Sequence, residues 1–298
     1  MRGHVWARRG AAAVLGLPLR GRARRGSTPL VPREASLQLL PKGYPQTRIW
    51  GYDGAVPGTE IRVPQGARVQ RQLVNDLPEA TSVHWHGIRI DNVMDGVSGL
   101  TQDAVPPGET FDYDFTVPDA GTYWYHAHNR SYVQVARGLR GALIVAEPHA
   151  PDVDRDEVLI LDDWLIDPET GQIAKTFDQP MMMSHGGRSG NYVTTNGQYN
   201  LTLTAQRNDR LRLRLINAAN ARIFALRLQG MTGWTVALDG MPLAQPRPVA
   251  DTPLLGPAPR IDSVVPTTAP PGAPAALLTA ATPEPPPPGA LTLTGQSA

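Results

Sequence analysis

The sequence predicts an all-β protein made of two consecutive Greek-key β-sandwich or barrel domains, on three observations. The 298 residues include 29 Gly and 30 Pro, which favours many short strands joined by turns. Short segments that alternate apolar and polar residues recur along the chain, and none shows a sustained helical period. A proline- and aspartate-rich break near residue 150 divides these segments into two sets, each long enough for one domain.

Residues 1–40 are predicted to be a basic leader. Residues 1–25 contain seven Arg and no acidic residue, and Arg8 and Arg9 precede an apolar run from Gly10 to Leu19. This is the layout of an export signal, and paired arginines indicate the twin-arginine route to a periplasmic or exported location. A disordered leader or an incorrectly assigned start codon is the alternative. The run is about half the ~20 residues that cross a bilayer, so we expect no membrane anchor.

The charge and cysteine content exclude several kinds of partner and chemistry. Beyond residue 25 the chain has 21 basic and 27 acidic side chains, a net charge of −6. Nucleic-acid-binding proteins usually present a basic surface, so we expect no nucleic-acid partner. The sequence contains no Cys, which excludes disulfides and thiolate chemistry.

Residues 41–149 are predicted to form the first domain. Two alternating segments flank the turn PQG in GTEIRVPQGARVQRQLVND, and the strand TSVHWHGIRI follows. In FDYDFTV the residues Phe111, Tyr113, Phe115 and Val117 share one face. GTYWYHAH and GLRGALIVAE complete a set of strands at sandwich spacing.

Residues 150–270 are predicted to form a second domain without metal ligands. In RLRLRLIN the leucines are expected to face the core, and Arg210, Arg212 and Arg214 are expected to face outward. Residues 271–298 are rich in Pro and Ala, and the stretch ATPEPPPPGA predicts a linker or tail.

Two pairs of histidines mark the candidate site, at His84 and His86 and at His126 and His128. Only seven histidines occur in the chain. Residues i and i+2 of a strand point to one face, so neighbouring strands would bring four imidazoles together. Crowded imidazoles repel one another when protonated and lose solvation when buried neutral, and a bound metal ion resolves both problems. Ligand type alone leaves Cu, Zn, Ni and Fe open.

The residues around the histidines resemble the first domain of the multicopper oxidases, the family of laccases and bacterial copper oxidases. The likeness covers the HxHG pair, the DG-x-x-x-x-TQ segment from Asp95, the PPG turn and the GTYWYHxH pair. It continues through VLILDDWLID and VTTNGQ. From about Pro41 to Val265 the sequence is similar to the first two of three domains. The resemblance implies cupredoxin-like folds and copper.

The resemblance also implies a role for each candidate residue. His84 would bind the type 2 copper, and His86, His126 and His128 would bind the type 3 coppers. Asp95 would orient a water molecule on the type 2 copper and help to deliver protons as dioxygen is reduced. The alternative for Asp95 is that it only shapes the turn before Gly96. The family's activity is one-electron oxidation of a reducing substrate coupled to reduction of O₂ to water.

The chain lacks the family's type 1 copper ligands and the other half of the cluster ligands. The HxxHxH and HCHxxxH motifs of the third domain are absent, as is any histidine after His185. Three interpretations stay open. The chain is a truncated or frame-shifted product, or the partner of a separate third-domain chain, or a protein reassigned to copper binding or scaffolding. On these grounds we expect it to be inactive alone, and we expect the exposed half-site to favour a homo-oligomer or a third-domain partner.

The segment PMMMSHGG also suggests soft copper ligands. Met181, Met182, Met183 and His185 fall within eight residues of one another. Flexible methionine side chains more often fill gaps in packing, so we expect a packed loop here.

Overall fold

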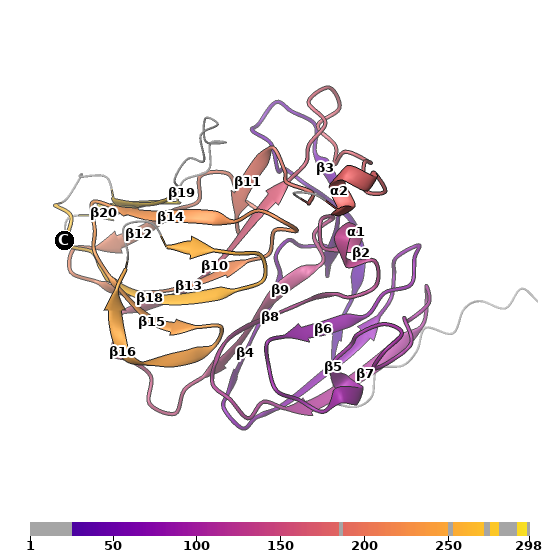
Figure 1. Ribbon diagram of the computed structural model, residues 1–298, viewed down its shortest axis with the longest axis horizontal. Coiled ribbons are helices and arrows are strands. Elements are labelled where there is room, and N and C mark those ends of the chain that lie inside the picture. Colours follow the sequence, from indigo (N-terminus) through magenta and orange to yellow (C-terminus); the bar gives the residue numbers. More distant parts are fainter. Residues whose placement is uncertain (1–25, 185–186, 250–252, 271–274, 280–290, 297–298) are drawn as a thin grey trace, which may run out of the picture.

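The structure is a computed structural model that describes residues 26–184, 187–249, 253–270, 275–279 and 291–296. These residues form 20 strands and three short helices, which confirms the predicted all-β class. Two β-lobes lie side by side, the first drawn in indigo to magenta and the second mainly in orange (Figure 1). The predicted leader residues 1–25 and the stretch ATPEPPPPGA lie outside the described residues.

The first lobe consists of two facing sheets and a hairpin. One sheet has the order β1–β5–β7, the other has the order β4–β9–β8–β6, and β2 pairs with β3. Their bounds are β1 Thr28–Leu30, β2 Pro32–Leu37, β3 Thr47–Tyr52, β4 Gly58–Pro64, β5 Arg68–Val74, β6 Val83–His86, β7 Thr110–Thr116, β8 Gly121–Ala127 and β9 Arg140–Ala146. The helices η1 (Asn92–Met94) and α1 (Ser131–Gln134) lie in the connections.

The second lobe repeats this architecture with larger sheets. The orders are β11–β10–β13–β18–β15–β16 and β12–β20–β19–β14–β17. Their bounds are β10 Arg155–Trp164, β11 Tyr192–Thr195, β12 Thr202–Gln206, β13 Arg210–Asn217, β14 Phe224–Gln229, β15 Trp234–Leu238, β16 Met241–Pro248, β17 Leu254–Leu255, β18 Arg260–Pro266, β19 Ala275–Thr279 and β20 Leu291–Gln296. The helix α2 (Pro180–Ser184) precedes β11. In the described ranges α1 and α2 have 4 and 5 residues, so neither could cross a bilayer.

Each lobe has its own apolar core. In the first, the predicted inward face of β7 is confirmed, because Tyr113 and Phe115 are buried and their rings contact the fully buried Trp85 at 5.4 and 4.9 Å between centroids. In the second, Leu211, Leu213 and Leu215 are buried as expected. A third apolar cluster joins the lobes, where Trp124 and Ile144 pack with Ile160 and Ile216.

The predicted boundaries at residues 40 and 271 differ from the structure. Strands β1 and β2 lie inside the predicted leader, and β19 and β20 lie inside the predicted tail. Each belongs to the lobe through a pairing with a distant strand, such as Thr28 with Arg71 and Leu203 with Leu293. Pairing with a distant strand decides whether a short proline-containing segment becomes a strand. Such pairing produces no recognisable pattern in the local sequence.

The arginines of β13 correct another prediction. Arg210 is exposed as expected, but Arg212 and Arg214 are only 3% and 1% exposed. Their face of the sheet packs on the first lobe, where Arg214 donates to Thr122 Oγ1 at 2.8 Å. Asp156 and Asp262 accept from Arg214, and Glu147 and Asp262 accept from Arg212. The alternating pattern was therefore right, but the outward face meets protein instead of water.

Candidate metal centre

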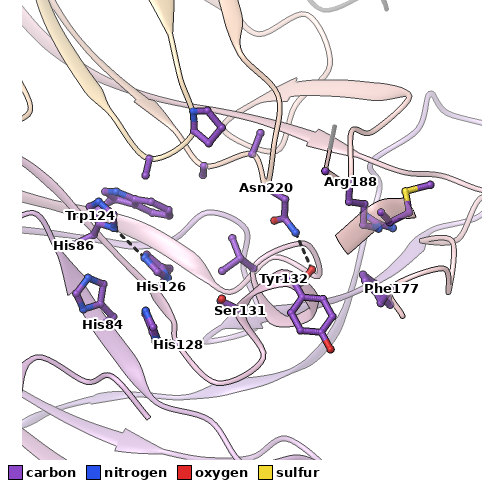
Figure 2. A pocket seen from close by; sticks show the side chains of 17 residues that line it. His84, His86, Trp124, His126, His128, Ser131, Tyr132, Phe177, Arg188 and Asn220 are labelled. Carbon is purple, nitrogen blue, oxygen red and sulfur yellow. Dashed lines mark hydrogen bonds between the residues drawn. The ribbon is translucent and has the colours of Figure 1, made fainter. Parts of the chain in front are cut away.

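The four histidines come together through the pairing of β6 with β8. In the antiparallel register His84 lies opposite His126, and His86 lies opposite Trp124. Side chains opposite one another on one face of a sheet have Cβ atoms about 5 Å apart. The ring of His84 lies 5.4, 5.3 and 5.1 Å from the rings of His86, His126 and His128 between centroids. Figure 2 shows the four imidazoles grouped at one end of a pocket.

The nitrogen atoms have a spacing that suits a metal ion. His86 Nδ1 and His126 Nε2 lie 3.2 Å apart. Two nitrogens bound to one tetrahedral ion at about 2.0 Å would be about 3.3 Å apart. Ligand atoms of His84, His86 and His126 all lie within 4.8 Å of one another. The donor set therefore fits a metal ion, and His128 borders it with its ring 5.9 Å from that of His126.

Hydrogen bonds to the backbone orient two of the rings. His84 Nδ1 donates to the carbonyl oxygen of Asp95 at 2.8 Å, and His126 Nδ1 donates to that of Ala127 at 3.0 Å. With the proton on Nδ1, the lone pair of Nε2 in each ring is available to bind a metal ion. Such partners fix the tautomer and orientation of metal-binding histidines.

Asp95 lies directly beside His84, because the chain turns tightly after η1. Its carboxylate Oδ1 is 3.3 Å from His84 Nδ1. The next residue, Gly96, has φ +79°, and a Cβ there would lie 1.7 Å from the carbonyl oxygen of Val83. Ser82 Oγ also donates to the Gly96 carbonyl at 2.7 Å. A residue with a side chain could not approach β6 this closely, so Gly96 sets the position of Asp95.

Burial favours the neutral form of three of the imidazoles, those of His84, His86 and His126. Burial, followed by the positive charge of Arg260, lowers the pKa of His86 to about 3. Burial also lowers the pKa of His126 well below its usual value, and the neighbouring histidines add to this effect. The pKa of His84 is lowered by burial although Asp95 opposes the shift. Neutral imidazole is the form that binds metal, so no proton has to leave before an ion enters at neutral pH.

The surrounding pocket has a volume of about 480 Å³ and lies between the lobes. Trp124 stacks on His86 with centroids 5.1 Å apart, and its ring is 4.3 Å from that of His126. Tyr132 and Asn220 line the pocket farther along, where Asn220 Nδ2 donates to the Tyr132 carbonyl at 2.8 Å. Arg188 and Phe177 lie at the far end (Figure 2).

Sequence reasoning missed these lining residues for different reasons. Trp124 sits two residues before His126 in GTYWYHAH, so strand periodicity could have placed it on the same face. Asn220 and Arg188 come from loops of the second lobe, and no local pattern connects them with the histidines. Of the methionine segment, Met182 lines the pocket and Met181 is 65% exposed. His185 lies outside the described residues.

Comparison with known proteins identifies the lineage. The family model described as multicopper oxidase matches residues 35–150. A crystal structure of Lac15 from a marine microbial metagenome is 40% identical, with a TM-score of 0.78, over 91% of this chain and 68% of that one. The chain belongs to the multicopper oxidase family. This membership identifies copper as the metal and oxidoreductases as the lineage.

Other multicopper oxidases align with more of this chain than the family model does. The crystal structure of a multi-copper oxidase from Pseudomonas thermotolerans is 36% identical, with a TM-score of 0.83, over 91% of this chain and 64% of that one. Multicopper oxidase MmcO of Mycobacterium tuberculosis is 33% identical over 263 residues, 79% of this chain and 51% of that protein. The chain thus spans about half the length of that curated relative.

Proposed function

We propose that this chain supplies one wall of a trinuclear copper centre that couples one-electron oxidation of a substrate to reduction of O₂ to water. His84 is assigned to the type 2 copper, and His86, His126 and His128 are assigned to the type 3 coppers. The observation that carries the proposal is the convergence of four imidazoles, two of which donate through Nδ1 to backbone carbonyls.

The residues of this chain would hold the copper ions, orient the histidine rings and shield the site from water. Trp124 covers the rings of His86 and His126 and keeps water from that side. Asp95 fixes the His84 ring and provides a carboxylate that can carry a proton at the edge of the site. Copper supplies the one-electron chemistry with dioxygen as acceptor. Turnover needs a thiolate-bound type 1 copper, and with no Cys among these 298 residues that centre has to come from elsewhere.

The cellular location is part of the proposal. The arginine pair before an apolar run, at Arg8 and Arg9, supports export to the periplasm through the twin-arginine route. That route carries folded proteins, which suits a metal site assembled from two strands. A fusion of residues 1–40 to a reporter tests this assignment: Arg8→Lys plus Arg9→Lys should block export of the reporter.

A second candidate function is non-catalytic copper binding or scaffolding by an exported cupredoxin-fold protein. The absence of Cys favours it, because a copper-binding role does not require a type 1 centre. The two candidates differ when a type 1 domain of a relative is added. Oxidation of a laccase dye after mixing supports the oxidase, and copper binding with no oxidation supports the second candidate.

Copper stoichiometry tests the site itself. We expect the purified chain to retain copper on dialysis without a blue colour and without dye oxidation on its own. His86→Ala plus His126→Ala should abolish retention, whereas the exposed His149→Ala should leave it unchanged. Equal copper content in all three proteins would remove the site assignment.

A further inference from the structure

A second cavity of about 500 Å³ lies between the β2–β3 hairpin and the segment that follows β10. It shares no lining residue with the histidine pocket. Its walls are tied together across the sequence. Thr47 Oγ1 donates to the Gly171 carbonyl at 2.7 Å, and Gln172 Oε1 accepts from the backbone of Arg48 at 2.9 Å. The cavity is therefore preformed by segments about 120 residues apart.

The cavity is lined by three cations and one carboxylate. Arg48, Arg137 and Lys175 face Glu34, whose Oε1 already accepts from Trp50 Nε1 at 3.2 Å. No carboxylate of the described residues forms an ion pair with any of the three cations. The lining therefore has an excess of positive charge, which Glu34 offsets only in part.

Arg137 is the most constrained of these cations. Its guanidinium lies over the ring of Trp50 at 4.6 Å and over that of Phe177 at 5.1 Å, and its carbonyl accepts from the Trp50 backbone at 2.8 Å. Its Nε is buried and has no hydrogen-bond partner. Burial lowers the pKa of Arg137, and the more distant charges of Glu79 and Glu34 only partly oppose this. Arg137 is half-buried, so it loses part of its hydration without gaining an ion-pair partner, and an anion would offset that cost.

Most other arginines that are buried or half-buried differ from Arg137 in their partners. Five of them contact a carboxylate: Arg140 with Asp162, Arg212 with Glu147 and Asp262, Arg214 with Asp156 and Asp262, Arg222 with Asp163, and Arg260 with Asp239. The buried Arg188 instead donates to the Ala174 carbonyl. Among the described residues no carboxylate forms an ion pair with Arg137, and two further cations line the same cavity. A group with several oxygen atoms is the kind of acceptor that suits a planar guanidinium and two exposed cationic side chains.

We propose that this cavity binds a small multivalent oxyanion, a phosphate or a di- or tricarboxylate, held by Arg137 at its base and by Arg48 and Lys175 at its rim. Trp50 and Phe177 fix the Arg137 guanidinium in place, so little side-chain entropy is lost on binding. Glu34 opposes the anion and limits its affinity. The site shares no lining residue with the metal pocket, although Phe177, which contacts Arg137, lines that pocket.

Isothermal titration of the copper-free full chain tests the proposal, with inorganic phosphate and citrate as separate probes at low ionic strength. We expect saturable binding of at least one probe with one site per chain. Arg137→Gln should weaken it about tenfold, the size of one charge-assisted hydrogen bond. The exposed pair Arg48→Gln plus Lys175→Gln should weaken it without affecting the fold. Binding of one probe alone identifies phosphate or carboxylate as the ligand class.

Glu34→Gln keeps the acceptor for Trp50 and removes the opposing charge, so it should tighten binding several-fold. A damaged fold cannot produce that gain. Arg247→Gln, an exposed arginine of β16, is the matched control and should not change affinity. No saturable binding of either probe, or equal affinity in Arg137→Gln, Glu34→Gln and the unaltered chain, overturns the proposal.

Discussion

Two polar clusters near the contact between the lobes differ in whether their own side chains neutralise their charge. Arg212 and Arg214 are nearly inaccessible, and the carboxylates Glu147, Asp156 and Asp262 balance their charge. The histidine cluster is only partly buried, and the permanently charged group that acts on His86 is a cation, Arg260. The first cluster is neutralised by its own carboxylates, whereas the second can accept an added cation because burial keeps His84, His86 and His126 neutral. A cluster whose charges are balanced by neighbouring side chains is therefore structural, whereas a cluster without such partners can bind a ligand.

The largest expected effect is on the self-neutralised cluster. Asp262 is 1% exposed and accepts from both Arg212 and Arg214. Asp262→Ala leaves buried cations short of a partner, so we expect a loss of about 3–5 kcal/mol in the free energy of unfolding. Urea denaturation followed by circular dichroism measures it. A loss below about 1 kcal/mol would mean that water reaches these arginines.

The second effect is a pH dependence specific to the histidines. An unfolded histidine gains a proton below pH 6.5, whereas folded His86, with its pKa lowered to about 3, does not. The free energy of unfolding therefore keeps the full contribution of such a buried histidine above pH 6.5. It falls as the pH drops toward 3, by up to about 1.4 kcal/mol per pH unit for each histidine. Unfolding of the copper-free chain between pH 7 and pH 4 measures it.

A double variant separates the contribution of these histidines to the pH dependence of unfolding from that of other titrating groups. His86→Ala plus His126→Ala should flatten the decline between pH 6.5 and pH 4, because the groups responsible are gone. Identical slopes in the two proteins would show that the imidazoles are as solvated when folded as when unfolded.

A smaller effect is expected from the carboxylate beside the cluster. Asp95→Ala removes the Oδ1 next to His84 Nδ1 but leaves the backbone acceptor, so we expect copper affinity to fall about tenfold. Competition with a copper chelator measures it. Asp103→Ala, an exposed neighbour in the same loop, is the control. An unchanged affinity in Asp95→Ala would leave this residue the role of shaping the turn.

The smallest effect is expected at an exposed ion pair. The side chain of Arg89 is 77% exposed and pairs with Asp119 at 3.0 Å. Water and salt screen such pairs, so Arg89→Ala should leave the unfolding free energy unchanged within error. A clear loss in the same urea assay would weaken the contrast drawn with Asp262.

Local pattern predicted the parts of the molecule that local geometry decides. Alternation placed Tyr113, Phe115 and the three leucines of β13 in the cores, and the spacing of two within each histidine pair placed all four imidazoles on one face. Contacts between distant segments were not predictable in this way. The alternating pattern does not predict that the face carrying Arg212 and Arg214 packs on the other lobe, nor that β1 pairs with β5. Asn220 and Arg188 reach the metal pocket through the same kind of long-range packing.

The ion pair between Arg140 and Asp162 has a consequence for how the chain folds. Arg140 belongs to β9 of the first lobe and Asp162 to β10 of the second, and both are nearly inaccessible. Arg140 also lies 4.8 Å over the ring of Trp164. A first lobe formed by itself would hold an unbalanced cation against an uncovered apolar edge. The two lobes should therefore melt in one calorimetric transition, and a fragment ending near residue 150 should fold poorly on its own.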